Sequence, residues 1–235
     1  MSQAESHRYQ AYFEASLAKS LARYEERVGE AFPVPVKIEC ARDEGFWAYA
    51  KGSSDRLKLD VSAGALIRLR VVWNAELQRS EAMPPEQQIA LLGHKDHAIE
   101  TSFAWLLQHE LNHHAIGHFD LIDGAALAEG QSPHGLGVVQ RAAQSTSRVN
   151  ALTKSELAQL HMCLELQTDH DATEIVLGAY ARENWPLFRY YAICVLVVIF
   201  IIEVEERQLN KPLRYHPSAA TRLFMLIAYL VEMPM

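Results

Sequence analysis

The chain has 235 residues with a formal net charge of −7 at pH 7, and 49% of its residues are hydrophobic while 22% are charged. This composition is typical of a globular protein that buries a large core; it excludes a disordered chain, and the length favours a single domain over residues 1–235. The negative charge, without any cluster of basic residues, argues against a nucleic-acid partner.

Cysteine usage and the N-terminal segment both bear on the compartment. Cys40, Cys163 and Cys194 are scattered along the chain and form no C-x-x-C pattern, which suits a reducing compartment. Residues 1–20 are polar and amphipathic and lack the apolar core of a signal peptide. We therefore expect a cytoplasmic protein.

Helical spacing of apolar residues predicts one long packing helix over residues 4–30, which ends before Pro33. Three short strands are expected next, the first two paired as a hairpin, over residues 34–40, 46–50 and 57–61. Ala63 and Gly64 then turn the chain into a helix over residues 65–77. A small N-terminal sheet followed by helices predicts an α+β fold that is mostly helical.

The sequence HELNH, residues His109 to His113, has the spacing H-E-x-x-H that is typical of zinc enzymes. Residues four apart lie on one face of a helix, so His109 and His113 can bind the same metal ion. Glu110 lies next to the first of these ligands, where it can polarise a water molecule. The pattern predicts a metal site, with chance histidines on a buried helix as the alternative.

The helix that carries this motif is predicted over about residues 99–117, with Thr101 or Ser102 as its N-cap and Gly117 at its end. His118 follows at the wrong distance for the longer zinc-binding pattern H-E-x-x-H-x-x-G-x-x-H. We therefore expect His118 to end the helix or to order a loop through hydrogen bonds, and to bind the metal only as a fallback.

Residues 121–153 form a long segment rich in glycine, serine, threonine and glutamine. Long irregular segments in compact domains are commonly functional lids or disordered regions, and the sequence leaves both interpretations open. A short helix is predicted inside this segment, over residues 138–144. Our hypothesis is that the segment is a lid over the site.

The third metal ligand is expected on a second site helix, over residues 155–181, because a catalytic zinc usually takes three protein ligands. Glu165 and Asp169 lie four residues apart on one face of that helix, in a mostly apolar turn. Burying such a pair is costly unless it has partners. We predict that Glu165 binds the metal and that Asp169 accepts the ring N–H of a ligating histidine. Asp169 or His170 is the fallback ligand, and a solvated acidic face is the alternative.

Residues 190–202 are apolar on every side but fall short of the roughly 20 residues that a membrane-spanning helix needs, so a buried central helix is expected. His216 and Pro217 then start a further helix that contains Arg222. A histidine can stabilise an oxyanion, and an arginine can orient a buried carboxylate such as Asp169. Taken alone, a helix cap and a surface arginine are the simpler interpretation.

Three motifs in this order, H-E-x-x-H, E-x-x-x-D and H-P-x-x-x-x-R, resemble those of gluzincin metallopeptidases of the CAAX-prenyl-protease and HtpX type, over residues 100–225. The matching residues are His109, Glu110 and His113, then Glu165 and Asp169, then His216, Pro217 and Arg222. That family is built around membrane-spanning helices, and this sequence contains no convincing one.

The resemblance implies a zincin-like fold with one Zn²⁺ per chain. The zinc ligands that it implies are His109, His113 and Glu165. Glu110 would then be the catalytic base, and His216 and Arg222 would support the site.

Residues 102–122 also resemble the soluble Lit-type phage-exclusion peptidases, which are zinc proteases that cleave a host translation factor during phage infection. This second resemblance implies a cytoplasmic endopeptidase that acts on a protein or peptide substrate in phage defence. The alternatives are a zincin-fold regulatory or binding protein without turnover, a membrane-associated quality-control peptidase of the HtpX type, and a helical protein with chance histidines.

Overall fold

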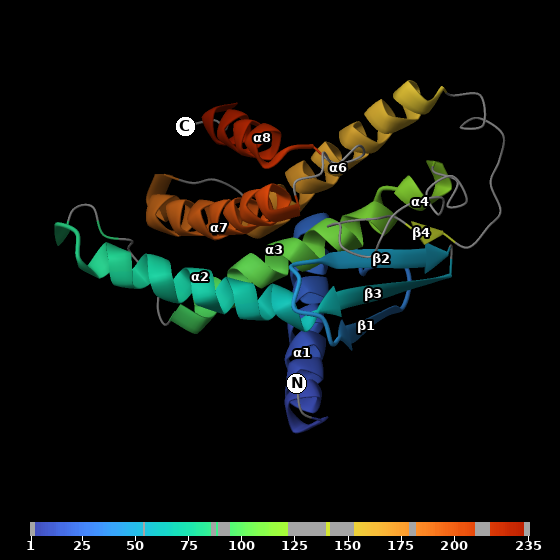
Figure 1. Ribbon diagram of the computed structural model, residues 1–235. Coiled ribbons are helices and arrows are strands. Elements are labelled where there is room, and N and C mark those ends of the chain that lie inside the picture. The colour runs from blue at the N-terminus through green and yellow to red at the C-terminus, as the bar shows by residue number, and fades with distance from the viewer. Residues whose placement is uncertain are drawn as a thin grey trace.

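The computed structural model describes residues 3–53, 55–85, 88, 95–121, 140–141, 153–178, 182–209 and 217–232. They are mostly helical with a small sheet, which confirms the α+β class (Figure 1). The long helices are α1 (Gln3–Val28), α2 (Ala63–Glu81), α3 (Lys95–Ala115), α6 (Lys154–Leu177), α7 (Trp185–Leu209) and α8 (Ala219–Glu232). The strands are β1 (Val36–Ala41), β2 (Ala48–Ser53), β3 (Arg56–Ser62) and β4 (Gln140–Arg141), and the short pieces are α4 (His118–Leu121) and η3 (Arg182–Asn184).

The sheet has the strand order β1-β3-β2-β4, so the predicted hairpin between the first two strands is wrong. β3 lies between them, parallel to β1 and antiparallel to β2. Its inward side chains are large, aliphatic and buried: Leu57, Leu59 and Val61. Its other residues form charge pairs with the neighbouring strands, Lys58 with Glu39 and Asp60 with Lys51. The strand whose aliphatic side chains are buried along its whole length therefore takes a central position in the sheet.

Helix α3 runs through the middle of the molecule and contacts α1, α2, α6, α7 and β2 (Figure 1). It begins at Lys95, four residues before the predicted start at residue 99. The prediction was late because the first turn of the helix is polar and shows no apolar periodicity. It ends at Ala115, and Gly117 follows with φ +74°, a conformation that favours glycine at a helix end. The predicted role of Gly117 is confirmed.

Thr101 and Ser102 are buried in the middle of α3 and do not cap it, contrary to the prediction. The hydroxyl of Ser102 instead accepts a hydrogen bond from Nε1 of Trp73 at 3.0 Å. It also donates to the carbonyl of Cys194 at 2.9 Å. These two bonds connect α3 to α2 and α7, and they satisfy polar groups that would be costly to bury alone.

Helix α6 begins after Thr153, which forms a reciprocal capping box with Glu156. It ends at Leu177, four residues earlier than predicted, because Gly178 has φ +72° and ends the helix. Most of the predicted lid, residues 121–153, lies outside the described residues. Residues 140–141 are described and form β4 beside β2, where the sequence predicts a short helix.

Helix α7 contains the apolar run 190–202 and is helical as predicted, but it is longer than the run. Its segment Trp185–Glu205 is long and apolar enough, by length and composition alone, to cross a membrane, and half of the tested window is buried inside the molecule. Helices at the core of soluble proteins meet the same criterion. The buried side packs on α2, α3 and α8, while Leu196 and Phe200 are exposed.

Candidate metal centre

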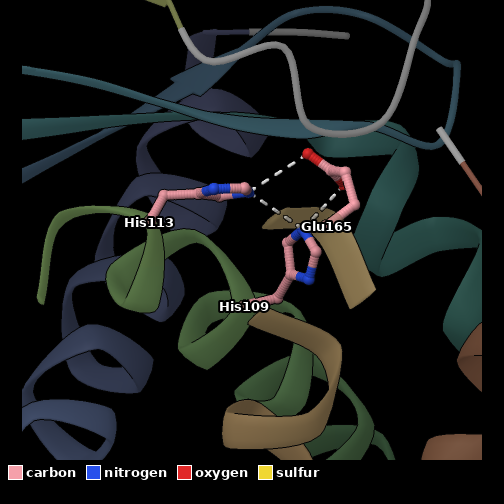
Figure 2. A group of neighbouring side chains, drawn as sticks. All are labelled: His109, His113 and Glu165. Carbon is pink, nitrogen blue, oxygen red and sulfur yellow. Dashed lines mark hydrogen bonds and ion pairs between the residues drawn. The ribbon is translucent and has the colours of Figure 1, made fainter. Parts of the chain in front are cut away.

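Two helices supply the three side chains of the candidate metal centre. His109 and His113 project from α3 one turn apart, and Glu165 faces them from α6 (Figure 2). All three are buried, with exposed fractions of 4%, 0% and 3%. α3 and α6 pack against each other, and the three buried side chains place the site within the core of the molecule.

The ligand atoms of these residues lie close to one another. Nε2 of His109 and Nε2 of His113 are 3.3 Å apart, and each lies 3.4 Å from a different carboxylate oxygen of Glu165. Two atoms bound tetrahedrally to one ion at about 2.0–2.1 Å are about 3.3–3.4 Å apart, which matches the spacing of the two nitrogens, and the Glu165 carboxylate turns one oxygen toward each of them. His109, His113 and Glu165 can therefore hold a metal ion.

Asp169 lies one helical turn after Glu165, behind His109. Its Oδ1 is 2.9 Å from Nδ1 of His109, on the side of the ring opposite the candidate ion position. Nδ1 of His109 makes no hydrogen bond of normal geometry within the described part of the chain, and the contact is a close ion pair. Asp169 thus takes the predicted position behind a ligand, and His170, the other fallback ligand, lies at the surface beside Asp171.

The charge state of His109 follows from these neighbours. Burial lowers its pKa, but the contacts with Asp169 and Glu165 outweigh burial and raise the pKa to about 10. In the metal-free protein His109 is therefore an imidazolium at neutral pH.

Arg222 reaches the same carboxylates from α8 and is 4% exposed, so the interpretation as a surface arginine is wrong. Its Nη1 donates to both oxygens of Asp169, the predicted partner. Its Nη2 also donates to Oε2 of Glu165 at 3.2 Å, a contact that the sequence did not indicate. In the metal-free site the carboxylates of Glu165 and Asp169 thus face two cations, Arg222 and the protonated His109. The balance of charge lowers the free-energy cost of burying these groups.

Glu110 is 1% exposed and lies on the side of α3 that packs against β2. Among the described residues, neither of its oxygens has a hydrogen-bond partner of normal geometry. Burial raises the pKa of Glu110 to about 8, although the charge of His109 and the backbone N–H of Ala50 in β2 oppose the shift. The buried carboxyl group is therefore largely protonated at pH 7 when no metal is bound.

His118 begins α4 and lies against the far side of His113. The two Nδ1 atoms are 3.0 Å apart, the ring planes are inclined by 62°, and His118 is 1% exposed. Burial lowers the pKa of His118, while the Gln167 side chain opposes the shift. His118 does not belong to this group of candidate ligands, and its ring lies within hydrogen-bonding distance of His113.

His216, predicted to support the site, lies outside the described residues. Pro217 is buried two residues before the start of α8. The hydroxyl of Ser218 accepts the N–H of Thr221 at 3.1 Å, so the helix begins where the sequence predicts.

A scan against models of protein families, a search of curated proteins and a search of solved structures each found no match for this chain.

Proposed function

We propose that the protein is a zinc-dependent endopeptidase of the gluzincin type, with one Zn²⁺ bound by His109, His113 and Glu165. The observation that carries the proposal is the set of three distances, 3.3 Å between the two Nε2 atoms and 3.4 Å from each to Glu165. Two imidazoles and one carboxylate form the donor set of catalytic zinc sites that keep a fourth position open.

The charges around the ligands also favour a divalent cation. Glu165, Asp169 and Glu110 are three carboxyl groups in or beside the site, and Arg222 is a permanent cation. When His109 is neutral and Glu110 is ionised, three negative charges balance Arg222 and one divalent ion. The proton on His109 partly substitutes for that ion in the metal-free protein.

The expected chemistry is hydrolysis of a peptide bond. When bound, Zn²⁺ supplies a Lewis acid that polarises the carbonyl and makes water more acidic. Glu110 accepts the proton of the attacking water and later gives it to the leaving amine. A pKa of about 8 in the metal-free protein suits a group that both accepts and returns a proton near neutral pH. His216 would steady the oxyanion, a role that stays a prediction.

The proposed substrate is a protein or peptide segment bound in extended form along β2. β4 pairs with this strand only at Lys51 and Gly52. Ala48 to Ala50 have no strand beyond them on that side among the described residues, and the N–H of Ala50 lies beside Glu110. An extended segment could add to this edge through main-chain hydrogen bonds and reach the catalytic carboxylate.

A second candidate is a zinc-binding protein without turnover. It is favoured by the near-complete burial of the three ligands and Glu110, each at most 4% exposed. Hydrolysis requires that a substrate carbonyl reach these groups, whereas metal binding alone does not.

The test combines zinc content with hydrolysis of an unfolded protein and a peptide library. We expect about one zinc per chain in wild type and Glu110→Gln, and none in His113→Ala or Glu165→Ala. The control His7→Ala, at the surface of α1, should keep its zinc. Hydrolysis by wild type but not by Glu110→Gln supports the peptidase. Zinc without hydrolysis favours the second candidate, and wild type without zinc removes both.

The phage-defence role and the cytoplasmic location are narrower parts of the proposal, and they rest on the resemblance to Lit-type peptidases. Their test is phage infection of a host that expresses the protein. Protection by wild type and its loss in Glu110→Gln would support the role, and equal plaque counts for the two would contradict it.

A further inference from the structure

We propose that His118 is a positioning residue, which fixes the tautomer and the orientation of the ligand His113. This inference rests on the proposed metal site and assigns a function to a residue outside the ligand group. It depends on the 3.0 Å contact between the Nδ1 atoms of the two rings.

The two nitrogens of His113 face different partners. Nε2 faces His109 at 3.3 Å and Glu165 at 3.4 Å, while Nδ1 faces His118. A neutral imidazole binds a metal through its unprotonated nitrogen, so the ring proton must be on the other one. In the metal-binding form His113 therefore donates its Nδ1–H, and His118 accepts it at Nδ1 and carries its own proton on Nε2.

The chain geometry that brings the two rings together is specific. Residues five apart on an uninterrupted helix point about 140° apart around the axis and do not touch. The helix ends at Ala115, and Gly117, with φ +74°, reverses the chain so that His118 folds back against His113. Both rings are at most 1% exposed, so water does not replace this acceptor, and an unpaired Nδ1–H would be costly there.

The groups that orient the two histidine ligands thus differ in charge: a carboxylate lies behind His109, and a neutral imidazole lies behind His113. Asp169, a carboxylate, lies 2.9 Å from Nδ1 of His109, and it increases the basicity of that ring. His118 orients His113 with an uncharged acceptor and adds no further negative charge to the site. The alternative is that His118 only packs α4 against α3.

A matched pair of variants separates these two roles. Asn and Leu side chains have nearly the same shape, but His118→Asn keeps an acceptor atom near the position of Nδ1, and His118→Leu does not. The control is His114→Leu, because the ring of His114 packs against Phe32 and Phe119. Circular dichroism and the melting temperature of each metal-free variant establish that it is folded.

The measurement is zinc affinity by competition with a chromophoric chelator. We expect His118→Leu to bind zinc about 10- to 100-fold more weakly than wild type, and His118→Asn and His114→Leu to stay within about threefold. Wild-type affinity in His118→Leu, or equal weakening in both His118 variants, would overturn the inference. If wild type binds no zinc, the proposed metal site itself is wrong. This outcome differs from those that contradict only the positioning role of His118, so the two proposals can fail separately.

A second measurement does not depend on any variant. Long-range ¹H–¹⁵N NMR of zinc-loaded wild type reports which ring nitrogen of each histidine carries a proton. We expect His118 as the Nε2–H tautomer and His113 with its proton on Nδ1. A proton on Nδ1 of His118 would overturn the inference even if His118→Leu failed to fold.

Discussion

Arg222 on α8 donates from one guanidinium nitrogen to both carboxylate oxygens of Asp169 on α6, and the two side chains are only 4% and 6% exposed. Because Asp169 also contacts His109, this pair connects α8 to the helix that carries the histidines. Removing either partner would leave the other charge in the core without its closest counter-charge, which is strongly destabilising.

Replacing Arg222 with methionine should therefore destabilise the protein strongly. We expect the free energy of unfolding of the metal-free protein to fall by about 3–5 kcal/mol, because Asp169 loses its main cationic partner. Urea unfolding at pH 7 measures this loss. The control is Arg207→Met, which removes an exposed pair with Glu203 and should cost less than about 1 kcal/mol. Equal losses in both variants would contradict the structural role of Arg222.

The ligand group could be predicted because its spacing is local to two helices. His109 and His113 are one turn apart on α3, as are Glu165 and Asp169 on α6, and apolar neighbours indicated that both pairs are buried. The contact between Arg222 and Glu165 could not be predicted, because it depends on how α8 packs on α6. The spacing of residues within α6 or within α8 does not reveal how the two helices pack against each other.

The contact between His118 and His113 was missed for a related reason. The distance of His118 from His113 in the sequence indicates no contact on a regular helix, and the chain reversal at Gly117 creates one.

The predicted strand pairing was wrong because alternation identifies strands but not their partners: β3 pairs with both β1 and β2. Helix lengths were underestimated where polar first turns, such as that of α3, hide the apolar period.

Zinc should stabilise the folded protein by mass action. At a free zinc concentration of 100 times Kd, we expect a gain of about 2.7 kcal/mol, or an increase in melting temperature of about 5–11 °C for a chain of this size. The measurement is a thermal melt of chelator-treated protein with and without zinc. Glu165→Gln should show no comparable increase, and an equal increase in this variant would place the zinc elsewhere.

The burial of Glu110 predicts a pH-dependent effect on the metal-free protein. Its pKa rises from 4.5 to about 8, so between these values the folded protein keeps a proton that the unfolded chain has lost. The stability that this carboxyl group contributes is therefore complete below pH 4.5 and declines as the pH rises through 8. Glutamine stays neutral throughout this range. The melting temperature of Glu110→Gln should rise relative to wild type between pH 5 and pH 8, and a constant difference would contradict the buried, protonated state.

Zinc binding should release protons at pH 7, because the metal-free site holds two that the loaded site does not need. Burial lowers the pKa of His109, but Asp169 and Glu165 outweigh it and raise the pKa to about 10, and a ligating nitrogen must lose this proton. Glu110 holds the second proton and should ionise beside a divalent ion. Titration calorimetry in buffers of different ionisation enthalpy should give about two protons per zinc for wild type and about one for Glu110→Gln. If Glu110→Gln binds zinc and releases none, His109 is not the imidazolium that its contacts with the two carboxylates imply.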